Sequence, residues 1–448
     1  MLDRCHHCVR MICSLRKNSF FICDAYSFIF VAVLVGLLAN FCGLYDILLF
    51  EKSFPAEFTW PPRVFDHSTY EEYQKTSENR RIDYYEFSSS LVSSLEEWKL
   101  NSAFWKLEQG EGDEPASFAP GMMSLVGQIP LVRRHIQYLQ AITRPVPDFP
   151  APTACRNSAS SGALRTGLLI LVKSAITHVA RRNAIRQTWA AGSAHRSSRK
   201  NGPSYEVMFV LGVSGGVGVS GTGEFSYRHQ ADLMEEQNRH GDIIQTQFVD
   251  TYFNNTAKTI SGIHYLFNDC PILDPRNGFL FLTDDDMMVN VKNLEALTES
   301  IKQERDTQSV PRDIYLGYRF PGSKPKRWRW SKWYISTDEY PCSWYPPYIT
   351  AAGVLLSKDT AEKFFYASHF IPLFRFDDIY LAIIAHMLDV ESEHRGDAFF
   401  FEHLPLVDGN AGLYRDSVIA VHGYHDPALM ISAYRKLEQI TAKALINL

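Results

Sequence analysis

Three consecutive carboxylates follow a short apolar run in the middle of the chain. Asp284, Asp285 and Asp286 come one residue after the run Phe279 to Leu282. Such a run is typical of a strand buried on both faces, so the carboxylates should lie at its carboxyl end, where open α/β sheets bind ligands. Because adjacent carboxylates repel one another, a cation should accompany them, and a divalent ion that also bridges to a phosphate fits best. A solvated acidic turn is the alternative.

Arginines cluster after the first predicted strand, Gly167 to Lys173. Arg181, Arg182 and Arg186 fall near the start of a predicted helix, His178 to Trp189. A cluster of this kind, just past the carboxyl end of a strand, suits a diphosphate. A solvated basic helix face would show the same spacing.

Two more carboxylates and a late histidine could complete a site. Asp377 and Asp378 begin an apolar helix, Ile379 to Leu388, where a carboxylate serves either in chemistry or simply as a helix cap. His422 ends a strand-like segment that begins at Val418. A lone histidine in such a place is more often structural than a metal ligand.

A glycine-rich loop follows the second predicted strand, Tyr205 to Gly212. Gly216, Gly218 and Gly221 fit the spacing G-x-G-x-x-G of dinucleotide sites. The next helix begins only near Glu224, however, and no clean βαβ unit leads on to a ribose-binding acid. We therefore disfavour a nicotinamide-dependent enzyme.

The rest of the pattern indicates an α/β domain that begins near Arg165. Helices and strands alternate, with further elements expected at 225–238, 241–250, 259–268 and 313–317. Asn254 begins an N-glycosylation sequon that ends at Thr256. The basic and aromatic tract Lys324 to Tyr334 could bind a polyanion or form a loop whose rings stack on sugars.

The N-terminal region predicts a membrane anchor. From Ala25 to Tyr45 there are 21 residues without a charge, enough for one helical span. Basic residues precede this segment and acidic ones follow it, which places a short N-terminus in the cytosol and the rest on the luminal side. A cleaved signal peptide would need a small-residue cleavage site, which is not evident. We expect a tail at 1–24, an anchor at 25–50, a stem at 51–164 and a luminal domain at 165–448.

The net charge and the cysteine content limit which partners and which compartment we expect for this chain. The net charge of −5 over 448 residues gives no electrostatic reason to expect nucleic acid. Only Cys155, Cys270 and Cys342 lie in the predicted luminal part. A disulfide between Cys270 and Cys342 is one option there, although the odd count leaves a thiol over.

Taken together, these segments resemble the β1,3-glycosyltransferase family, which includes β1,3-galactosyltransferases, β1,3-N-acetylglucosaminyltransferases and, more remotely, Fringe. The resemblance runs from about Leu168 to the end of the chain. It is carried by several motifs in the family's order: Arg181 to Trp189, Glu236 with Gly241 to Ile244, Phe248 to Tyr252 with Asn254, Thr256, Lys258 and Thr259, Asp284 to Asp286, Tyr345 to Tyr348, and Asp377 to Tyr380.

The resemblance implies a GT-A fold with a mixed central sheet and an inverting, Mn²⁺-dependent transfer from a UDP-sugar. In that scheme Asp284 and Asp285 face the ribose and uracil of the nucleotide. The roles that it implies for other residues are Mn²⁺ binding by Asp286 and His422, general base catalysis by Asp378, and donor binding by Arg181 and Arg186.

A Golgi type II membrane protein that glycosylates a glycoprotein or glycolipid acceptor is the implied setting. The chain departs from the family pattern in three ways: Asp377 stands where glutamate is usual, Ala351 and Ala382 stand where glycine is usual, and the cysteine that is usual near Ile349 is not there. Added methyl groups could crowd a site built for close approach. A catalytically silent luminal glycan-binding protein or chaperone with the same fold is therefore the alternative function.

Overall fold

The computed structural model describes residues 130–158, 165–193, 205–214, 223–307, 313–337, 339–340, 344–369, 371–400 and 417–446, together with Phe30 and Val33. The predicted tail, anchor and the stem up to residue 129 otherwise lie outside this part of the chain. Within the described residues, no helix combines the length and apolarity that a bilayer span requires. The chain divides into two compact units, and Ser323–Tyr345 belongs to the smaller one.

The larger unit is built on a seven-stranded mixed sheet of order β3-β2-β1-β4-β7-β6-β8. The first four strands in this order are mutually parallel, whereas β7 is antiparallel to both β4 and β6, and β8 is parallel to β6. The strands are β1 (Leu168–Lys173), β2 (Tyr205–Val213), β3 (Ile243–Val249), β4 (Phe279–Asp284), β6 (Tyr315–Phe320), β7 (Tyr348–Ser357) and β8 (Glu393–His394). The α/β class and the mixed central sheet are thus confirmed.

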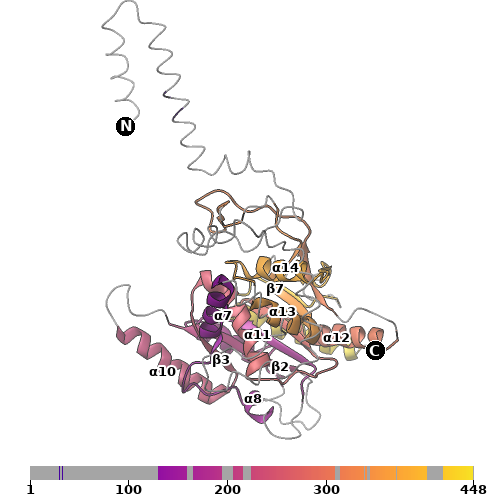
Figure 1. The fold of residues 1–448 in the computed structure, drawn as a ribbon. Coiled ribbons are helices and arrows are strands. Elements are labelled where there is room, and N and C mark those ends of the chain that lie inside the picture. Colours follow the sequence, from indigo (N-terminus) through magenta and orange to yellow (C-terminus); the bar gives the residue numbers. More distant parts are fainter. Residues whose placement is uncertain are drawn as a thin grey trace, which may run out of the picture. The chain divides into compact units, whose positions relative to one another are not determined.

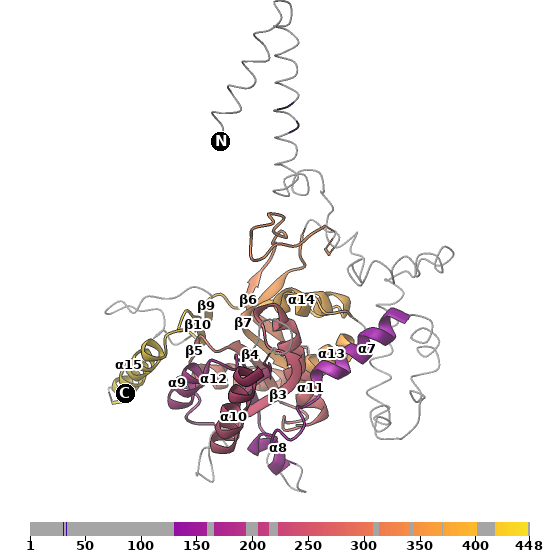
Figure 2. The ribbon, with the colours of Figure 1, turned by 90° about the vertical axis from the view of Figure 1, so that its left-hand side faces the viewer.

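Helices cover both faces of this sheet, which explains why its central strands are apolar without alternation. Figure 2 shows α9, α12 and α15 on one side of the sheet and α7, α11 and α13 on the other. The bounds are α7 (Pro130–Thr143), α8 (Thr153–Ser158), α9 (Val179–Gln187), α10 (Gly223–His240), α11 (Asn255–Asn268), α12 (Val291–Thr307), α13 (Lys358–Ser368), α14 (Asp377–Met387) and α15 (Pro427–Ile446). A short 3₁₀ helix, Tyr252–Asn254, precedes α11.

Strand register brings the site residues of the larger unit together. Lys173 at the end of β1 pairs with Asp284 at the end of β4. A separate three-stranded sheet, made of β5 (Met287–Val289), β9 (Phe399–Phe400) and β10 (Ala420–His422), follows directly after the acidic triplet. In it His422 pairs with Met287, so the late histidine is placed beside Asp286.

The compact domain begins earlier than the sequence suggested. The helix α7 packs against α11 and β3, as Figure 1 also shows. Pro145 bridges to Thr246, and the backbone N–H of Thr153 donates to the carbonyl of Gly241 at 2.8 Å. Residues 130–158, assigned above to the stem, are therefore part of the folded unit, because an apolar helix face and a backbone bridge fix them to it.

The disulfide also differs from the option raised above. Cys270 is bonded to Cys155, across a sequence separation of 115 residues. Cys342 lies outside the described residues. Because Cys155 belongs to α8, the disulfide ties this N-terminal extension covalently to the loop before β4.

Most predicted elements are observed close to their predicted bounds. The strand at 313–317 instead begins at Tyr315, and the helix expected from 259 begins at Asn255. Gly216 and Gly218 lie outside the described residues, and the helix after them begins at Gly223.

Candidate active site

A buried lysine organises the carboxyl edge of the sheet. The Nζ atom of Lys173 lies 3.0 Å from Asp284 Oδ1 and 2.6 Å from Asp377 Oδ2, and Thr259 donates to the same Asp377 oxygen at 2.8 Å. Burial alone would lower the pKa of Lys173, but the two carboxylates raise it above its ordinary value. Lys173 is therefore a fixed cation that joins β1, β4 and α14.

The two carboxylates that Lys173 contacts titrate differently. Burial raises the pKa of Asp284 to about 6, although Lys173 opposes the shift. For Asp377 the balance is reversed: burial would raise its pKa, but the charge and hydrogen bond of Lys173 hold it below the ordinary value. Asp377 is thus the ionised partner of the lysine.

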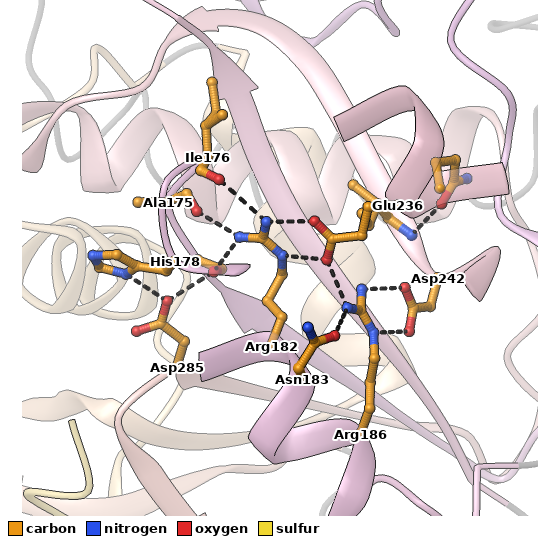
Figure 3. Close-up of polar contacts among 12 residues, drawn as sticks. Ala175, Ile176, His178, Arg182, Asn183, Arg186, Glu236, Asp242 and Asp285 are labelled. Atoms are coloured by element: carbon orange, nitrogen blue, oxygen red, sulfur yellow. Dashed lines mark hydrogen bonds and ion pairs between the residues drawn. The ribbon is translucent and has the colours of Figure 1, made fainter. Parts of the chain in front are cut away.

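Asp285 is the most tightly held member of the triplet. Its carboxylate accepts from Ser174 Oγ at 2.7 Å and from Arg181 at 2.9 Å. It also lies 2.8 Å from His178 Nδ1, a contact that Figure 3 shows. Burial would raise its pKa, but these partners, His178 first, hold it below the ordinary value. Arg181 also donates to the carbonyl of His425 at 3.1 Å, so it links the triplet to the segment after β10.

Asp286 and His422 form a pair that fits a divalent cation. His422 Nε2 lies 3.4 Å from Asp286 Oδ2. The other oxygen, Asp286 Oδ1, is buried and has no hydrogen-bond partner among the described residues, a state that buried carboxylates rarely tolerate. The carboxylate is a ligand type that suits Mn²⁺, and the imidazole is a ligand type of divalent transition metals in general. No group of three or more His, Cys, Asp or Glu side chains that could hold a metal occurs in the described part of the chain.

Asp378 is the group best suited to proton transfer. It begins α14 next to Asp377, and its Oδ1 accepts from the backbone N–H of Ile379 at 2.8 Å. Burial and the charge of Asp377 raise the pKa of Asp378 to about 7. A half-buried carboxyl whose pKa lies near neutrality matches what a general base requires.

Arg186, predicted to bind the donor, has a different setting. Its guanidinium is buried and donates to both oxygens of Asp242, at 2.9 and 2.8 Å, and to Glu236 at 2.6 Å. Arg182 is also buried and holds Glu236 through both carboxylate oxygens (Figure 3). This network joins α9, α10 and the start of β3, so we remove Arg186 from the proposed donor site.

The sequon is placed at the end of the 3₁₀ helix. Asn254 Nδ2 donates to the carbonyl of Val249 at 2.8 Å, and the Thr256 hydroxyl is buried against the carbonyl of Phe374. Glycosylation of Asn254 stays a prediction.

Sequence reasoning missed Lys173, Thr259, Ser174 and His178. Only Lys173 had a local signal, because it is a charged residue that ends an otherwise apolar strand. The other three contribute through contacts with residues more than 100 positions away.

Comparison with known proteins assigns this site to a family. A galactosyltransferase family model matches residues 180–395. The β-1,3-galactosyltransferase brn of Drosophila melanogaster is 35% identical over 269 residues, which cover 60% of this chain and 74% of that protein. This chain belongs to the β1,3-glycosyltransferase family. It is therefore a glycosyltransferase, as the resemblance implied.

Other members of the family agree. Human β-1,3-galactosyltransferase 5 is 31% identical over 235 residues, covering 52% of this chain and 67% of that protein. Lactosylceramide 1,3-N-acetyl-beta-D-glucosaminyltransferase B of Danio rerio is 34% identical over 235 residues, covering 52% and 56%. Among solved structures, the bifunctional glycosyltransferase WbbM has a TM-score of 0.30 at 12% identity, covering 59% of this chain and 47% of that one, which is too weak a likeness for inference about the fold.

Proposed function

We propose that this glycosyltransferase is an inverting, metal-dependent β1,3-transferase of the GT-A fold. It would move galactose, N-acetylglucosamine or N-acetylgalactosamine from a UDP-sugar to a glycan acceptor on a glycoprotein or glycolipid. The observation that carries the proposal is Asp378, whose pKa of about 7 comes from burial and from an ionised neighbour, Asp377. Relatives named for galactosyl and N-acetylglucosaminyl transfer support this donor range.

Asp378 would act on the acceptor. Its carboxylate takes the proton from the acceptor hydroxyl while that oxygen attacks the anomeric carbon and the bond from carbon to the UDP oxygen breaks. A single displacement inverts the anomeric centre, so a UDP-α-sugar gives a β-linked product. General base catalysis of this kind contributes about 10²–10⁴-fold.

The acidic triplet would hold the donor. Asp284 and Asp285 would face the ribose and uracil, with Arg181 beside Asp285 as a positive group at the same edge. Asp286 and His422 would hold Mn²⁺, which neutralises the charge that develops on the departing diphosphate. The two ion pairs of Lys173 would keep Asp284 and Asp377 in place while the donor binds.

We place the enzyme in the Golgi membrane as a single-pass type II protein with a luminal catalytic domain. This part of the proposal is supported by the charge-free segment from Ala25 to Tyr45 and the basic residues before it.

A donor and acceptor screen tests the proposal. UDP release from UDP-galactose, UDP-N-acetylglucosamine and UDP-N-acetylgalactosamine is measured with a panel of acceptors, with and without Mn²⁺. We expect release with one donor, dependent on Mn²⁺, and a loss of about 10²–10⁴-fold in Asp378→Asn with UDP binding retained. His422→Ala should raise the Mn²⁺ concentration needed for half-maximal rate.

The alternative function predicts a different result. A silent glycan-binding protein or chaperone would bind UDP or glycan but release no UDP with any pair. That outcome would move the assignment to the alternative, for which Ala351 and Ala382 are the motivating departures.

A further inference from the structure

The Ser323–Tyr345 segment of the smaller unit exposes a concentration of tryptophan that the transferase site does not use. Half of the eight tryptophans in the chain lie in it. Their exposed fractions are large for an aromatic residue: 54% for Trp328, 58% for Trp330, 49% for Trp333 and 39% for Trp344. By contrast, Trp189 in the larger unit is buried. Exposed apolar rings gathered in this way mark an interaction surface.

The same segment is basic although the whole chain is acidic. It contains five Lys or Arg against Asp338 and Glu339, which gives a net charge of +3, compared with −5 for the whole chain. Four of these cations, Lys324, Lys326, Arg329 and Lys332, are exposed. The surface therefore suits a negatively charged partner.

A buried arginine gives the unit its shape. Arg327 is buried and donates to the carbonyls of Ile335, Ser336 and Tyr340 at 2.7–2.9 Å. The ends of the unit meet where the backbone N–H of Tyr345 donates to the carbonyl of Ser323 at 2.9 Å. The exposed rings are thus displayed on an internally bonded scaffold.

The arrangement of the rings favours a lipid surface over a sugar. Lys324 Nζ lies 4.6 Å from the Trp344 ring centroid and Lys332 Nζ lies 4.3 Å from that of Trp333. One face of the Trp344 ring and one face of the Trp333 ring are therefore occupied by a cation and closed to a stacked pyranose. The exposed charged neighbours are donors only, whereas sugar hydroxyls also need acceptors.

We infer that the Ser323–Tyr345 segment docks on the luminal surface of the membrane, and that it docks more strongly where the lipid headgroups of that surface are negatively charged. Indole rings are enriched at the level of the headgroups because they combine an apolar body with a polar N–H. Lysine and arginine beside them reach the headgroup charges, and each contributes about fivefold to partitioning near an anionic surface. This inference is independent of the proposed reaction, since it uses none of the residues assigned to it.

Fluorescence quenching of the full chain tests the inference. The protein is transferred from detergent into vesicles of brominated phosphatidylcholine, with or without phosphatidylserine. We expect stronger quenching with phosphatidylserine, and weaker quenching as salt screens the attraction. Trp328→Phe combined with Trp330→Phe should remove most of the difference between the two lipids, whereas the buried Trp189 stays unquenched.

A charge variant separates docking from a general property of the chain. Lys326→Ala combined with Arg329→Ala keeps every ring and should lower the equilibrium constant for docking on vesicles that contain phosphatidylserine roughly 25-fold, fivefold for each cation. Its matched control, Arg276→Ala with Lys292→Ala, removes two exposed cations of the larger unit and should change nothing.

Either of two results would overturn the inference. One is equal quenching in both kinds of vesicle, unchanged by the tryptophan substitutions. The other is a change in Trp328 and Trp330 fluorescence on adding soluble N-acetyllactosamine, without any response to phosphatidylserine, which would assign the surface to a glycan.

Discussion

Adjacent aspartates at the start of α14 have pKa values shifted in opposite directions because Lys173 forms its ion pair with only one of them. Asp377 contacts Lys173 at 2.6 Å and has a lowered pKa, whereas burial and the charge of Asp377 outweigh the charge of Lys173 at Asp378 and raise its pKa to about 7. The charge of Asp377 is itself a cause of that rise. Asp377 thus raises the pKa of the proposed general base through its charge.

Asp377→Asn should therefore move the acid side of the activity profile. Removal of the negative charge lowers the pKa of Asp378, so the base stays ionised at lower pH. In the wild-type enzyme kcat/KM should fall as pH falls through about 7, because protonated Asp378 cannot accept the acceptor proton. The variant should retain activity to lower pH, as measured by kcat/KM from pH 5 to 9.

A matched substitution serves as the control for that result. Asp313 pairs with Lys363 at 2.8 Å at the start of β6, so Asp313→Asn also removes an aspartate from a lysine pair. The dependence of kcat/KM on pH in Asp313→Asn should be the same as in the wild-type enzyme. An unmoved profile in Asp377→Asn would mean that a group other than Asp378 sets the acid limit.

At this scale the sequence predicted residue types well and pairings poorly. The acidic triplet and Asp378 were visible because each is attached to an apolar element of recognisable period. Lys173 had a local signal, a charge at the end of an apolar strand, but its role could not be predicted because it depends on a partner 204 residues later. The pairing of Arg186 was missed for the same reason: nothing local shows that Asp242 and Glu236 would neutralise it.

Lys173 connects three elements, so its substitution should lower the free energy of unfolding as well as the activity. Lys173→Met leaves Asp284 and Asp377 without their cation at a largely buried position. Breaking such a pair costs about 3–5 kcal/mol, and we expect the lower end since Asp284 keeps contact with solvent. Urea unfolding measures the change.

Two comparisons identify the cause of that instability. Lys363→Met breaks a more exposed pair and should cost no more than about 1 kcal/mol. Adding Asp377→Asn to Lys173→Met should restore part of the stability, because it removes one uncompensated charge. If the double variant is less stable than Lys173→Met, the pairing does not explain the loss.

Three buried histidines join α7, α11 and α13 on the face of the sheet away from β10. His135 Nε2 lies 2.8 Å from the Ser368 carbonyl, and His264 Nε2 lies 2.8 Å from the Ser368 hydroxyl. The rings of His264 and His369 are 4.7 Å apart. Burial lowers the pKa of His135 and of His369 to about 4, and that of His264 well below its ordinary value.

These histidines should make the fold less stable in acid. The unfolded chain binds protons at histidine as pH falls below about 6.5, while the folded chain does not until about 4, so stability is lost across that window. One histidine accounts for about 2 kcal/mol between pH 7 and 5. His135→Gln keeps a donor for the Ser368 carbonyl. Between pH 7 and 5 its free energy of unfolding in urea should fall by about 2 kcal/mol less than that of the wild-type protein. An equal fall in the variant and the wild-type protein would contradict the assignment.

At the scale of the whole molecule, the sequence did not show that residues 130–158 belong to the folded domain, because their contacts are with residues distant in sequence. The proline-rich stretch 145–152 has the composition of a linker, yet it pairs with β3 and leads into a helix bonded to Cys270. The composition of this stretch shows that it has no helical or strand periodicity, but it cannot show which distant residues the stretch contacts. The sheet itself was predictable, since buried strands are visible as apolar runs.

A pair of truncations tests where the folded domain begins. A fragment from residue 165 loses α7 and Cys155, so it exposes the apolar surface of α11 and leaves Cys270 without its partner. Loss of a disulfide that closes a loop of 115 residues costs about 2–5 kcal/mol before any packing is counted. We expect that fragment to aggregate or unfold, and one from residue 130 to unfold cooperatively in urea. Cys155→Ser in the longer fragment should fall between them, because it keeps α7 but not the covalent link; equal stability of all three would place the boundary at residue 165 after all.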